Sequence, residues 1–292
     1  MKEVYEISDT TLNFFFPDNI SVFGKIVPND IPRKGETLCK TATYWFNRVE
    51  EKLGIDTHFI GMVEDNILSV QKIKGIIDKK KVDDNTTNYL IPLEFISRYF
   101  VAGSLYDRIA RGDIDYNMLG FDVKPSLGEP LPKPFFEVHS KLEENEKILN
   151  KKQALKHSGL NDEEFQQLKK KVLSIDELIK NDVEKNGLIY VDGRKEFAID
   201  KDRDIILVDT FGTADEDRFW EKDEYEKGNM VQKTKESVRK YYKDIGYQEK
   251  FMEARKNNDE EPSIPPLTDD LVEEISEAYV DMMKRLTDGK YT

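Results

Sequence analysis

The segment that decides the fold is GLIYVDGRKEFAIDKDRDIILVDTFGTADEDRFW, residues 187–220. Its first apolar run, 187–192, predicts a β-strand. The runs 196–200 and 205–209 flank a polar turn and predict a β-hairpin. Strands of this kind need other strands or helices to bury their apolar faces, so the segment is expected to be part of a larger sheet.

Two acids, Glu196 and Asp209, stand at opposite chain ends of the paired hairpin strands. Antiparallel pairing brings such ends to the same edge of the hairpin, so the two carboxylates can converge. Mg²⁺ is commonly held by one or two carboxylates together with nucleotide phosphates, which makes the two acids a candidate metal pair. The alternative, that both are only polar strand ends, is the more frequent outcome for so short a pattern.

The segment ends in a glycine-containing loop, where Arg218 is flanked by acids and followed by an aromatic pair. An arginine there can bind a phosphate or carboxylate, or it can form a salt bridge with Asp215 or Glu216, and the spacing leaves both open. Upstream, Arg98 precedes Gly103-Ser104, where glycine permits close backbone approach and a helix start can cradle phosphate. The sequence therefore contains two candidate anion-binding groups.

Other common site patterns are missing from the sequence. Neither a GxxxxGK[ST] loop nor a GxGxxG fingerprint occurs, which argues against a P-loop NTPase and a Rossmann dehydrogenase. The histidines His58, His139 and His157 have no zinc-like spacing, and no nucleophile has a base beside it. A single cysteine, Cys39, excludes an internal disulfide and favours a reducing, cytoplasmic location.

Hydrophobic periodicity and turn residues predict the elements around the central segment. The predictions are strands at 12–16 and 57–63, a helix at 38–53 capped by Gly54, a helix from Asn161 to near Gly187, an ordered loop at 120–134 and a last helix at 271–286. In the last helix Tyr279 is one of the apolar-face residues, and Cys39 and Trp45 are core residues of the first helix.

The composition limits the classes of partner. Lys and Arg total 45 against 58 Asp and Glu, so the 292-residue chain has a formal net charge of −13. Nucleic acids and anionic membranes need a positive surface, so neither is expected as a partner. A local cluster of cations can still bind a small anionic substrate. The length suggests about two domains, and the polar N-terminal stretch predicts neither a signal peptide nor a membrane anchor.

Several short motifs occur in the order in which one known family has them. The motifs are Lys2-Glu-Val-Tyr5; Asp18-Asn-Ile-Ser21 with Lys34-Gly35; Pro92-Leu-Glu94 with Arg98 and Gly103-Ser104; Leu131-Pro132 to Lys141; Val191-Asp192, Arg194 and Glu196-Phe197 with Leu207-Val-Asp209; and Gly212-Thr213, Asp215 and Arg218-Phe-Trp220 with Lys235 and Arg239. The fifth group is similar to VDxKxEF and LxDE, and the sixth is similar to GTPDSSRFW and DKxxxR. On these residues almost the whole chain resembles the SAICAR synthetase (phosphoribosylaminoimidazole-succinocarboxamide synthase) family.

The resemblance implies an α+β fold in two lobes with an ATP cleft between them. Residues 1–90 would form a small, antiparallel β-rich N-terminal lobe, and residues 91–292 a larger α/β lobe with the metal hairpin and the C-terminal helices. It also implies a ligase of purine biosynthesis, which joins L-aspartate to a carboxylated aminoimidazole ribonucleotide and releases ADP and phosphate. ATP is required because a carboxylate oxygen is a poor leaving group. The partners would be these small molecules, and a homo-oligomer stays open because family members are often oligomers.

The resemblance further implies roles for individual residues, with catalysis mainly by positioning and charge stabilisation. Catalytic residues would be Lys141, Arg194 and Asp215; ATP-binding residues Lys2, Glu94, Glu196 and Asp209, the last two through Mg²⁺; and substrate-binding residues Arg98, Ser104, Asp192, Asp215, Arg218, Lys235 and Arg239. Among the last group, Arg98, Ser104 and Arg218 would bind the 5′-phosphate of the ribonucleotide.

Several positions depart from the family pattern. Gly24 and Asn145 stand where acids are usual, Thr210 replaces the acid after the metal aspartate, Ala198 replaces a glycine, and Thr234 replaces the aspartate of DKxxxR. The lost acids concern a site that binds an amine. A related ligase with a different amine, a small-molecule kinase on the same scaffold, and a non-catalytic nucleotide-binding regulator therefore stay open as alternatives.

Overall fold

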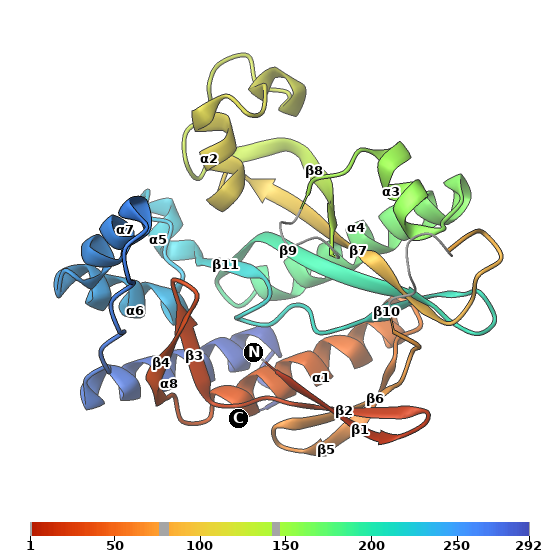
Figure 1. Cartoon of the computed structure of the whole chain (residues 1–292), viewed down its shortest axis with the longest axis horizontal. Coiled ribbons are helices and arrows are strands. Elements are labelled where there is room, and N and C mark those ends of the chain that lie inside the picture. Colours follow the sequence, from red (N-terminus) through yellow and green to blue (C-terminus); the bar gives the residue numbers. More distant parts are fainter. Residues whose placement is uncertain (1, 76–81, 142–146, 292) are drawn as a thin grey trace.

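The computed structural model of the chain describes residues 2–75, 82–141 and 147–291. The predicted hairpin is present and is part of a five-stranded antiparallel sheet (Figure 1). Its strands are β9 (Leu188–Ile199) and β10 (Ile205–Val208), and Glu196 lies opposite Val208. The fold is mixed α+β, as predicted.

One expectation for this segment is wrong, because the run 187–192 and the first arm of the hairpin are one continuous strand, β9. Arg194 and Lys195 interrupt the apolar run in the sequence and suggested a break. The strand continues through them because each has an acidic partner: Glu216 lies 2.6 Å from Arg194, and Asp217 lies 3.2 Å from Lys195. An ion pair allows a charged side chain to stay within a strand of a packed sheet.

The other strands of this sheet are β7 (Tyr89–Phe100), which lies between β9 and β8 (Pro130–Ser140), and β11 (Arg218–Glu221), which pairs with the first half of β9. The expected loop at 120–134 is therefore only partly a loop, because its last residues belong to β8. Three prolines in the part that belongs to β8, Pro130, Pro132 and Pro134, argued against a strand. They are tolerated because β8 is an edge strand of the sheet, where backbone N–H groups are not all needed for pairing.

The N-terminal region forms a second antiparallel sheet in the order β1-β2-β6-β5. Its strands are β1 (Glu3–Ser8), β2 (Thr11–Phe15), β5 (Phe59–Glu64) and β6 (Ile67–Gln71), so the strands predicted at 12–16 and 57–63 are both present. The helix α1 (Lys34–Leu53) packs on β5 and β6 and ends at Gly54, as predicted. Cys39 and Trp45 on α1 are fully buried.

A small hairpin of β3 (Asn19–Val22) and β4 (Lys25–Asp30) explains one departure from the family pattern. Phe23 and Gly24 form its two-residue turn with φ angles of 54° and 78°. Two consecutive positive φ angles are typical of the tight turns that join antiparallel strands, and glycine adopts them without strain. Gly24 is therefore a turn residue.

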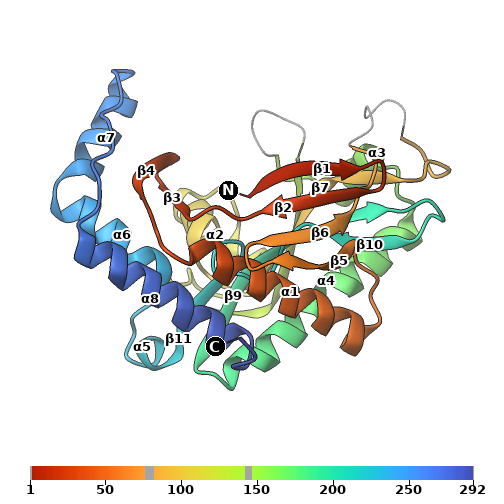
Figure 2. The ribbon, with the colours of Figure 1, turned by 90° about the horizontal axis from the view of Figure 1, so that it is seen from below.

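The long helices cover the sheets. The helix α4 (Asp162–Glu184) begins with a capping box at Asn161 and packs on β9 and β7, and the last helix, α8 (Asp269–Leu286), packs on α1. Figure 2 shows α8, α1 and α4 on the same side of the molecule. The remaining helices are α2 (Gly103–Arg111), the 3₁₀ turn Tyr116–Leu119, α3 (Lys151–Ser158), α5 (Lys222–Glu226), α6 (Lys233–Asp244) and α7 (Tyr247–Asn257).

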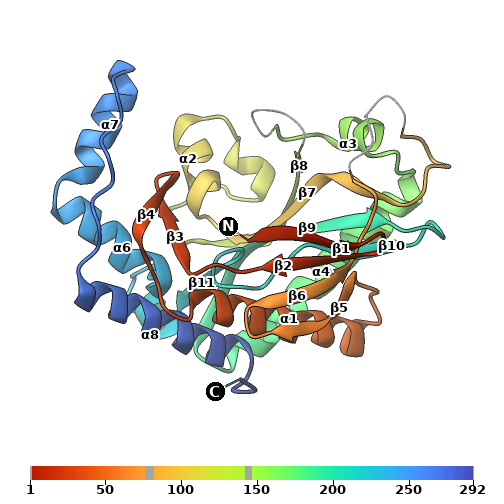
Figure 3. The ribbon, with the colours of Figure 1, turned by 60° about the horizontal axis from the view of Figure 1, so that its bottom comes forward.

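The largest hydrophobic core contains residues from both sheets and from α1, α4 and α8. This packing brings Lys2, which precedes β1, to Asp209, which follows β10. Figure 3 shows the N-terminal end of the chain beside the larger sheet. None of the described helices combines the length and the apolar composition that crossing a membrane requires. Residues far apart in the sequence thus meet beside the hairpin of β9 and β10.

Candidate active site

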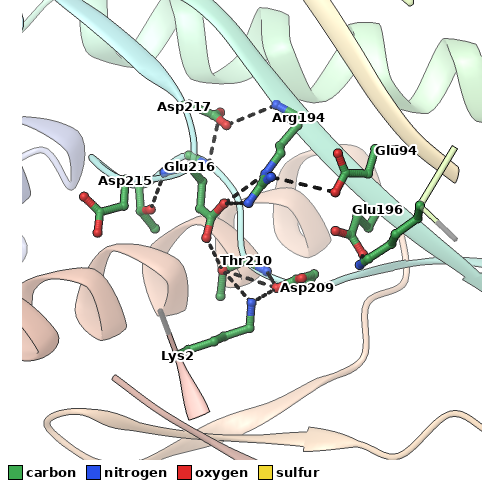
Figure 4. Close-up of polar contacts among 12 residues, drawn as sticks. Lys2, Glu94, Arg194, Glu196, Asp209, Thr210, Asp215, Glu216 and Asp217 are labelled. Carbon is green, nitrogen blue, oxygen red and sulfur yellow. Dashed lines mark hydrogen bonds and ion pairs between the residues drawn. The ribbon is translucent and has the colours of Figure 1, made fainter. Parts of the chain in front are cut away.

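The hairpin places the two predicted metal ligands together. Glu196 lies opposite Val208, and Asp209 follows directly with a φ angle of 60°. The amide of Thr210 donates a 2.6 Å hydrogen bond to Asp209 and holds its carboxylate. The ammonium group of Lys2 forms an ion pair with Asp209 (Figure 4). The ammonium group of Lys141 forms an ion pair with Glu196. Each carboxylate therefore already has a cation beside it.

The pKa values of the two carboxylates are shifted in opposite directions. Burial, together with the charge of Asp209, raises the pKa of Glu196 to about 7 against the opposing effect of Lys141. Burial also acts to raise the pKa of Asp209, but Lys2 outweighs it, and the pKa of Asp209 falls to about 2. Two neighbouring acids in a low dielectric favour a bound cation.

These two acids suit Mg²⁺ better than a metal that needs a closed set of protein ligands. Oxygen donors are the ligands that Mg²⁺ prefers, and nucleotide phosphates and water complete its shell. Within residues 2–75, 82–141 and 147–291, no three His, Cys, Asp or Glu side chains are grouped as a metal site. A pair of carboxylates fits an ion that arrives with ATP.

Arg194 lies between two acids at the centre of the site. One of its terminal nitrogens is 3.7 Å from Glu94, and the other is 2.6 Å from Glu216. The hydroxyl of Thr210 lies 3.3 Å from the second Glu216 oxygen and 3.4 Å from Asp209. The residue that replaces the usual acid at position 210 thus connects the carboxylate pair to Glu216 (Figure 4).

The predicted phosphate-binding residues form a second group. Arg98 donates to the Ser104 hydroxyl at 3.1 Å, and Asp192 lies 3.4 Å from Arg98 and 3.3 Å from Arg218. The alternative partners of Arg218 were Asp215 and Glu216. Its ion pair among the described residues is with Asp192 instead.

The backbone of this second group is shaped for close contact. Helix α2 begins at Gly103, and no side chain caps its first N–H groups, which are therefore available to an anion. A Cβ atom on Gly103 would lie 2.5 Å from the Arg218 guanidinium, and the φ angle of Gly103 is 51°. Only glycine allows Arg218 to lie against this helix start.

A cavity of about 570 Å³ lies beside the carboxylate pair. Its charged lining residues are Lys2, Lys34, Arg194, Asp215, Glu216, Lys235 and Arg239. Five of these were predicted from the sequence: Lys2, Arg194, Asp215, Lys235 and Arg239. The other predicted residues, Glu94, Arg98, Ser104, Lys141, Asp192, Glu196, Asp209 and Arg218, are not part of its lining. Two of these, Asp209 and Glu94, are joined to the lining by ion pairs with Lys2 and Arg194 respectively.

Two residues around Asp215 were missed as site residues. Lys34 pairs with Asp215 at 2.8 Å, and the Tyr279 hydroxyl donates to the same carboxylate at 2.6 Å. The spacing of Lys34 four residues before Leu38, on the apolar face of α1, was an available signal. Tyr279 gave none, because an apolar-face tyrosine is normally a core residue.

A buried charged network behind the site was also missed. Lys195, whose side chain is fully buried, lies 2.5 Å from Asp176 and 3.2 Å from Asp217. Asp217 also accepts hydrogen bonds from the backbone amides of Arg194 and Gly212. Burial raises the pKa of Asp217 to about 6, although Lys195 acts in the opposite direction. The network fixes β9 to the loop that carries Asp215.

Comparison with known proteins agrees with this geometry. The family model of SAICAR synthetase matches residues 1–254. The chain belongs to the SAICAR synthetase family. A phosphoribosylaminoimidazole-succinocarboxamide synthase of Thermoplasma acidophilum is 45% identical over 291 residues, which cover 100% of this chain and 97% of the relative. The corresponding protein of Thermoplasma volcanium is also 45% identical, with the same coverage.

Solved SAICAR synthetases share the fold. A structure titled SAICAR synthetase (Type-2) in complex with ADP is 25% identical, has a TM-score of 0.68, and is matched over 100% of this chain and 97% of its own. The Saccharomyces cerevisiae SAICAR synthase complexed with SAICAR has a TM-score of 0.76 at 24% identity, with 100% and 93% coverage. The architecture is thus that of SAICAR synthetases.

The structure describes most of the positions at which this chain departs from the family pattern. Thr210 bonds to Asp209 and Glu216, and Ala198 is fully buried in β9. Thr234 is fully buried at the start of α6, and its hydroxyl has no hydrogen-bond partner among the described residues. Asn145 lies outside the described residues.

Proposed function

We propose that the chain joins L-aspartate to the carboxylate of 5-amino-1-(5-phosphoribosyl)imidazole-4-carboxylate, with ATP converted to ADP and phosphate, in purine biosynthesis. One observation supports the arrangement of this reaction on the chain. Asp192, Arg194 and Glu196 alternate along β9 and so share one face of the strand. At about 3.3 Å per residue, the phosphate-binding end and the carboxylate pair lie roughly 13 Å apart. That spacing suits a ribonucleotide bound along the strand.

The residues divide between the two ends of the substrate. Arg98, Ser104 and Arg218 bind the 5′-phosphate at the start of α2. Lys2 and Lys141 lie beside the carboxylate pair and neutralise the phosphates of ATP. Mg²⁺ bound by Glu196 and Asp209 would supply further positive charge to those phosphates.

The reaction needs positioning more than a nucleophilic side chain. An oxygen of the substrate carboxylate attacks the γ-phosphorus of ATP, and ADP leaves. The amine of aspartate then attacks the activated carbon, an amine proton is lost, and phosphate leaves with the former carboxylate oxygen. Arg194, held between Glu94 and Glu216, is placed to orient the reacting carboxylate. Asp215 lines the cavity in which the amine enters.

The test is ADP release measured with the carboxylated ribonucleotide, against each amino acid in turn. Aspartate-dependent release is the expected result. Release that depends on another amine would identify a related ligase, and release without any amine would indicate a kinase. ATP binding without turnover under every condition would indicate a non-catalytic regulator, and each of these three results would contradict the proposal.

The proposal also covers the division into lobes, the cellular location and the oligomeric state. The lobes 1–90 and 91–292 would enclose ATP between them, and the ligase would work in the cytoplasm as a homo-oligomer. The single cysteine, Cys39, is buried and suits a reducing compartment. Limited proteolysis with and without ATP tests the lobes, and light scattering tests the association.

A further inference from the structure

The carboxylate of Asp215 is held by side chains from two helices. The Tyr279 hydroxyl, on α8, donates to Oδ1 at 2.6 Å, and the Lys34 ammonium, on α1, lies 2.8 Å from Oδ2. Lys235, on α6, donates to the backbone oxygen of the same residue at 3.2 Å. Both carboxylate oxygens and the backbone of Asp215 are therefore fixed.

Tyr279 and Lys34 are buried behind Asp215, whereas the Asp215 carboxylate is partly exposed. Tyr279 is 1% exposed, and the side chain of Lys34 is 3% exposed. The Lys34 ammonium also lies 5.4 Å from the centre of the Tyr279 ring, so the tyrosine contacts both members of the ion pair. The Asp215 side chain is 31% exposed and lines the cavity, so its remaining lone pairs are accessible to a ligand.

The cavity around Asp215 has the charges that an amino acid requires. Lys235 and Arg239 line it and can bind carboxylates, whereas Asp215 can accept hydrogen bonds from an amine. An acceptor that is fixed on its far side keeps its geometry when a ligand binds, so no ordering cost falls on the binding step.

We propose that Tyr279 is a positioning residue for the amine of the amino-acid substrate, acting through Asp215. This inference rests on the proposed function, because it requires an amine substrate in the cavity. Tyr279 lies 25 residues beyond residue 254, where the match to the family model ends. The last helix therefore contributes to the site as well as to the core.

The test compares Tyr279→Phe with Tyr242→Phe. Phenylalanine keeps the ring and its packing and removes only the hydroxyl. Tyr242 is the matched control, because it is also fully buried and its hydroxyl donates to the Pro265 carbonyl at 2.8 Å, outside the cavity lining. For Tyr279→Phe, KM for L-aspartate should rise about tenfold, as loss of a hydrogen bond to a charged group predicts. KM for ATP and for the ribonucleotide should stay unchanged, and Tyr242→Phe should leave all three values unchanged.

Three results would overturn the inference. An unchanged KM for aspartate in an active Tyr279→Phe enzyme would overturn it alone. An equal rise of all three KM values would also overturn it, because it would indicate a general structural role. A wild-type enzyme without aspartate-dependent ADP release would overturn both this inference and the proposed function. Partial unfolding does not obscure the comparison, because KM does not depend on the active fraction of the enzyme.

Discussion

Asp209 combines a left-handed backbone with an ionised carboxylate at the end of β10. Its φ angle is 60°, and its Oδ1 atom accepts from the amide of Thr210. Strained conformations of this kind are retained where the side chain must point in a particular direction. Asn and Asp are the non-glycine residues that tolerate the left-handed region best.

Asp209→Asn should therefore abolish ATP turnover and leave the fold intact. The amide removes the negative charge that pairs with Lys2 and that the proposed Mg²⁺ would require, but it has the same shape and tolerates the same backbone. Steady-state ADP release and a thermal melt measure the two effects. Unchanged kinetics would contradict the role of the carboxylate pair, and a collapsed melting transition would contradict the expected tolerance of the backbone.

Arg218 and Arg111 provide a matched pair for the phosphate end of the site. Arg218 pairs with Asp192 beside the start of α2, whereas Arg111 pairs with Asp113 at the exposed far end of the same helix. Arg218→Ala should raise KM for the ribonucleotide with little change for ATP, and Arg111→Ala should change neither. If Arg218→Ala raised both KM values equally, Arg218 would have a role in folding instead.

At the scale of elements, α2 has a glycine with a positive φ angle at each end. Gly103 has a φ angle of 51° and lies against Arg218, whereas Gly112 has a φ angle of 81° and has free space around the position of a Cβ atom. Alanine at either position should cost about 1 kcal/mol of stability through the backbone alone. Only at Gly103 would the new methyl group also collide with a side chain of the site.

Gly103→Ala should therefore raise KM for the ribonucleotide, and Gly112→Ala should not. Both variants should lower the free energy of unfolding in urea by similar amounts, apart from the cost of moving Arg218. Equal KM values in the two variants would show that contact between Arg218 and the helix start does not matter for substrate binding.

Most elements could be predicted from the sequence because their signals are local. The periodicity of α1, the capping residue Asn161 and the short apolar runs of the N-terminal strands depend on neighbours within one turn or one strand. The continuity of β9 could not be predicted, because Lys195 breaks the apolar pattern and its acidic partners come from residues 176 and 217. The prolines of β8 were misread for a similar reason, since a sequence does not show which strand is at the edge.

The candidate site could be predicted only where its residues form ordered motifs. The carboxylate pair and the Arg98–Ser104–Arg218 group come together in the structure, although their roles stay predictions. Tyr279 had the signal of a core residue, and its ring is indeed buried. Its hydroxyl matters only because α8 returns to Asp215, which is information about tertiary structure.

The whole molecule contains a buried histidine that links stability to pH. His58 is 4% exposed and packs against the rings of Phe14 and Phe46 at centroid distances of 5.6 Å. Burial lowers its pKa to about 3, while Asp209 opposes and Lys2 assists this shift. In the unfolded chain the pKa returns to about 6.5. Between pH 6.5 and 3 the unfolded chain therefore binds a proton that the folded chain does not.

The free energy of unfolding should decrease as the pH is lowered across this window. The decrease from His58 alone should be up to about 1.4 kcal/mol per pH unit. His58→Phe keeps an aromatic ring and removes the titrating group, so its stability should depend less on pH. Urea unfolding of both proteins between pH 7 and pH 4 measures the difference. Identical slopes would show that His58 does not titrate on unfolding.

The chain has a net charge of −13, and acidic residues also accompany the cations of the site. The cations expected to make a basic cleft do come together, but each has an acidic partner: Lys2 with Asp209, Lys141 with Glu196, Arg98 with Glu137 and Asp192, Arg194 with Glu94 and Glu216, and Arg218 with Asp192. The charges of these residues are therefore close to balanced. Binding of an anionic substrate must exchange these ion pairs for new ones.

The cavity is lined by both Lys2 and Tyr279, which are 277 positions apart in the chain. During synthesis the N-terminal strand therefore leaves the ribosome long before its partners in the site exist. Contacts of such long range also slow folding, because a large loop must close before they form. A chain released before α8 would expose the face of α1 that α8 covers and would lack the hydroxyl beside Asp215. Newly made chains should thus complete the support of Asp215 only after the last helix has docked.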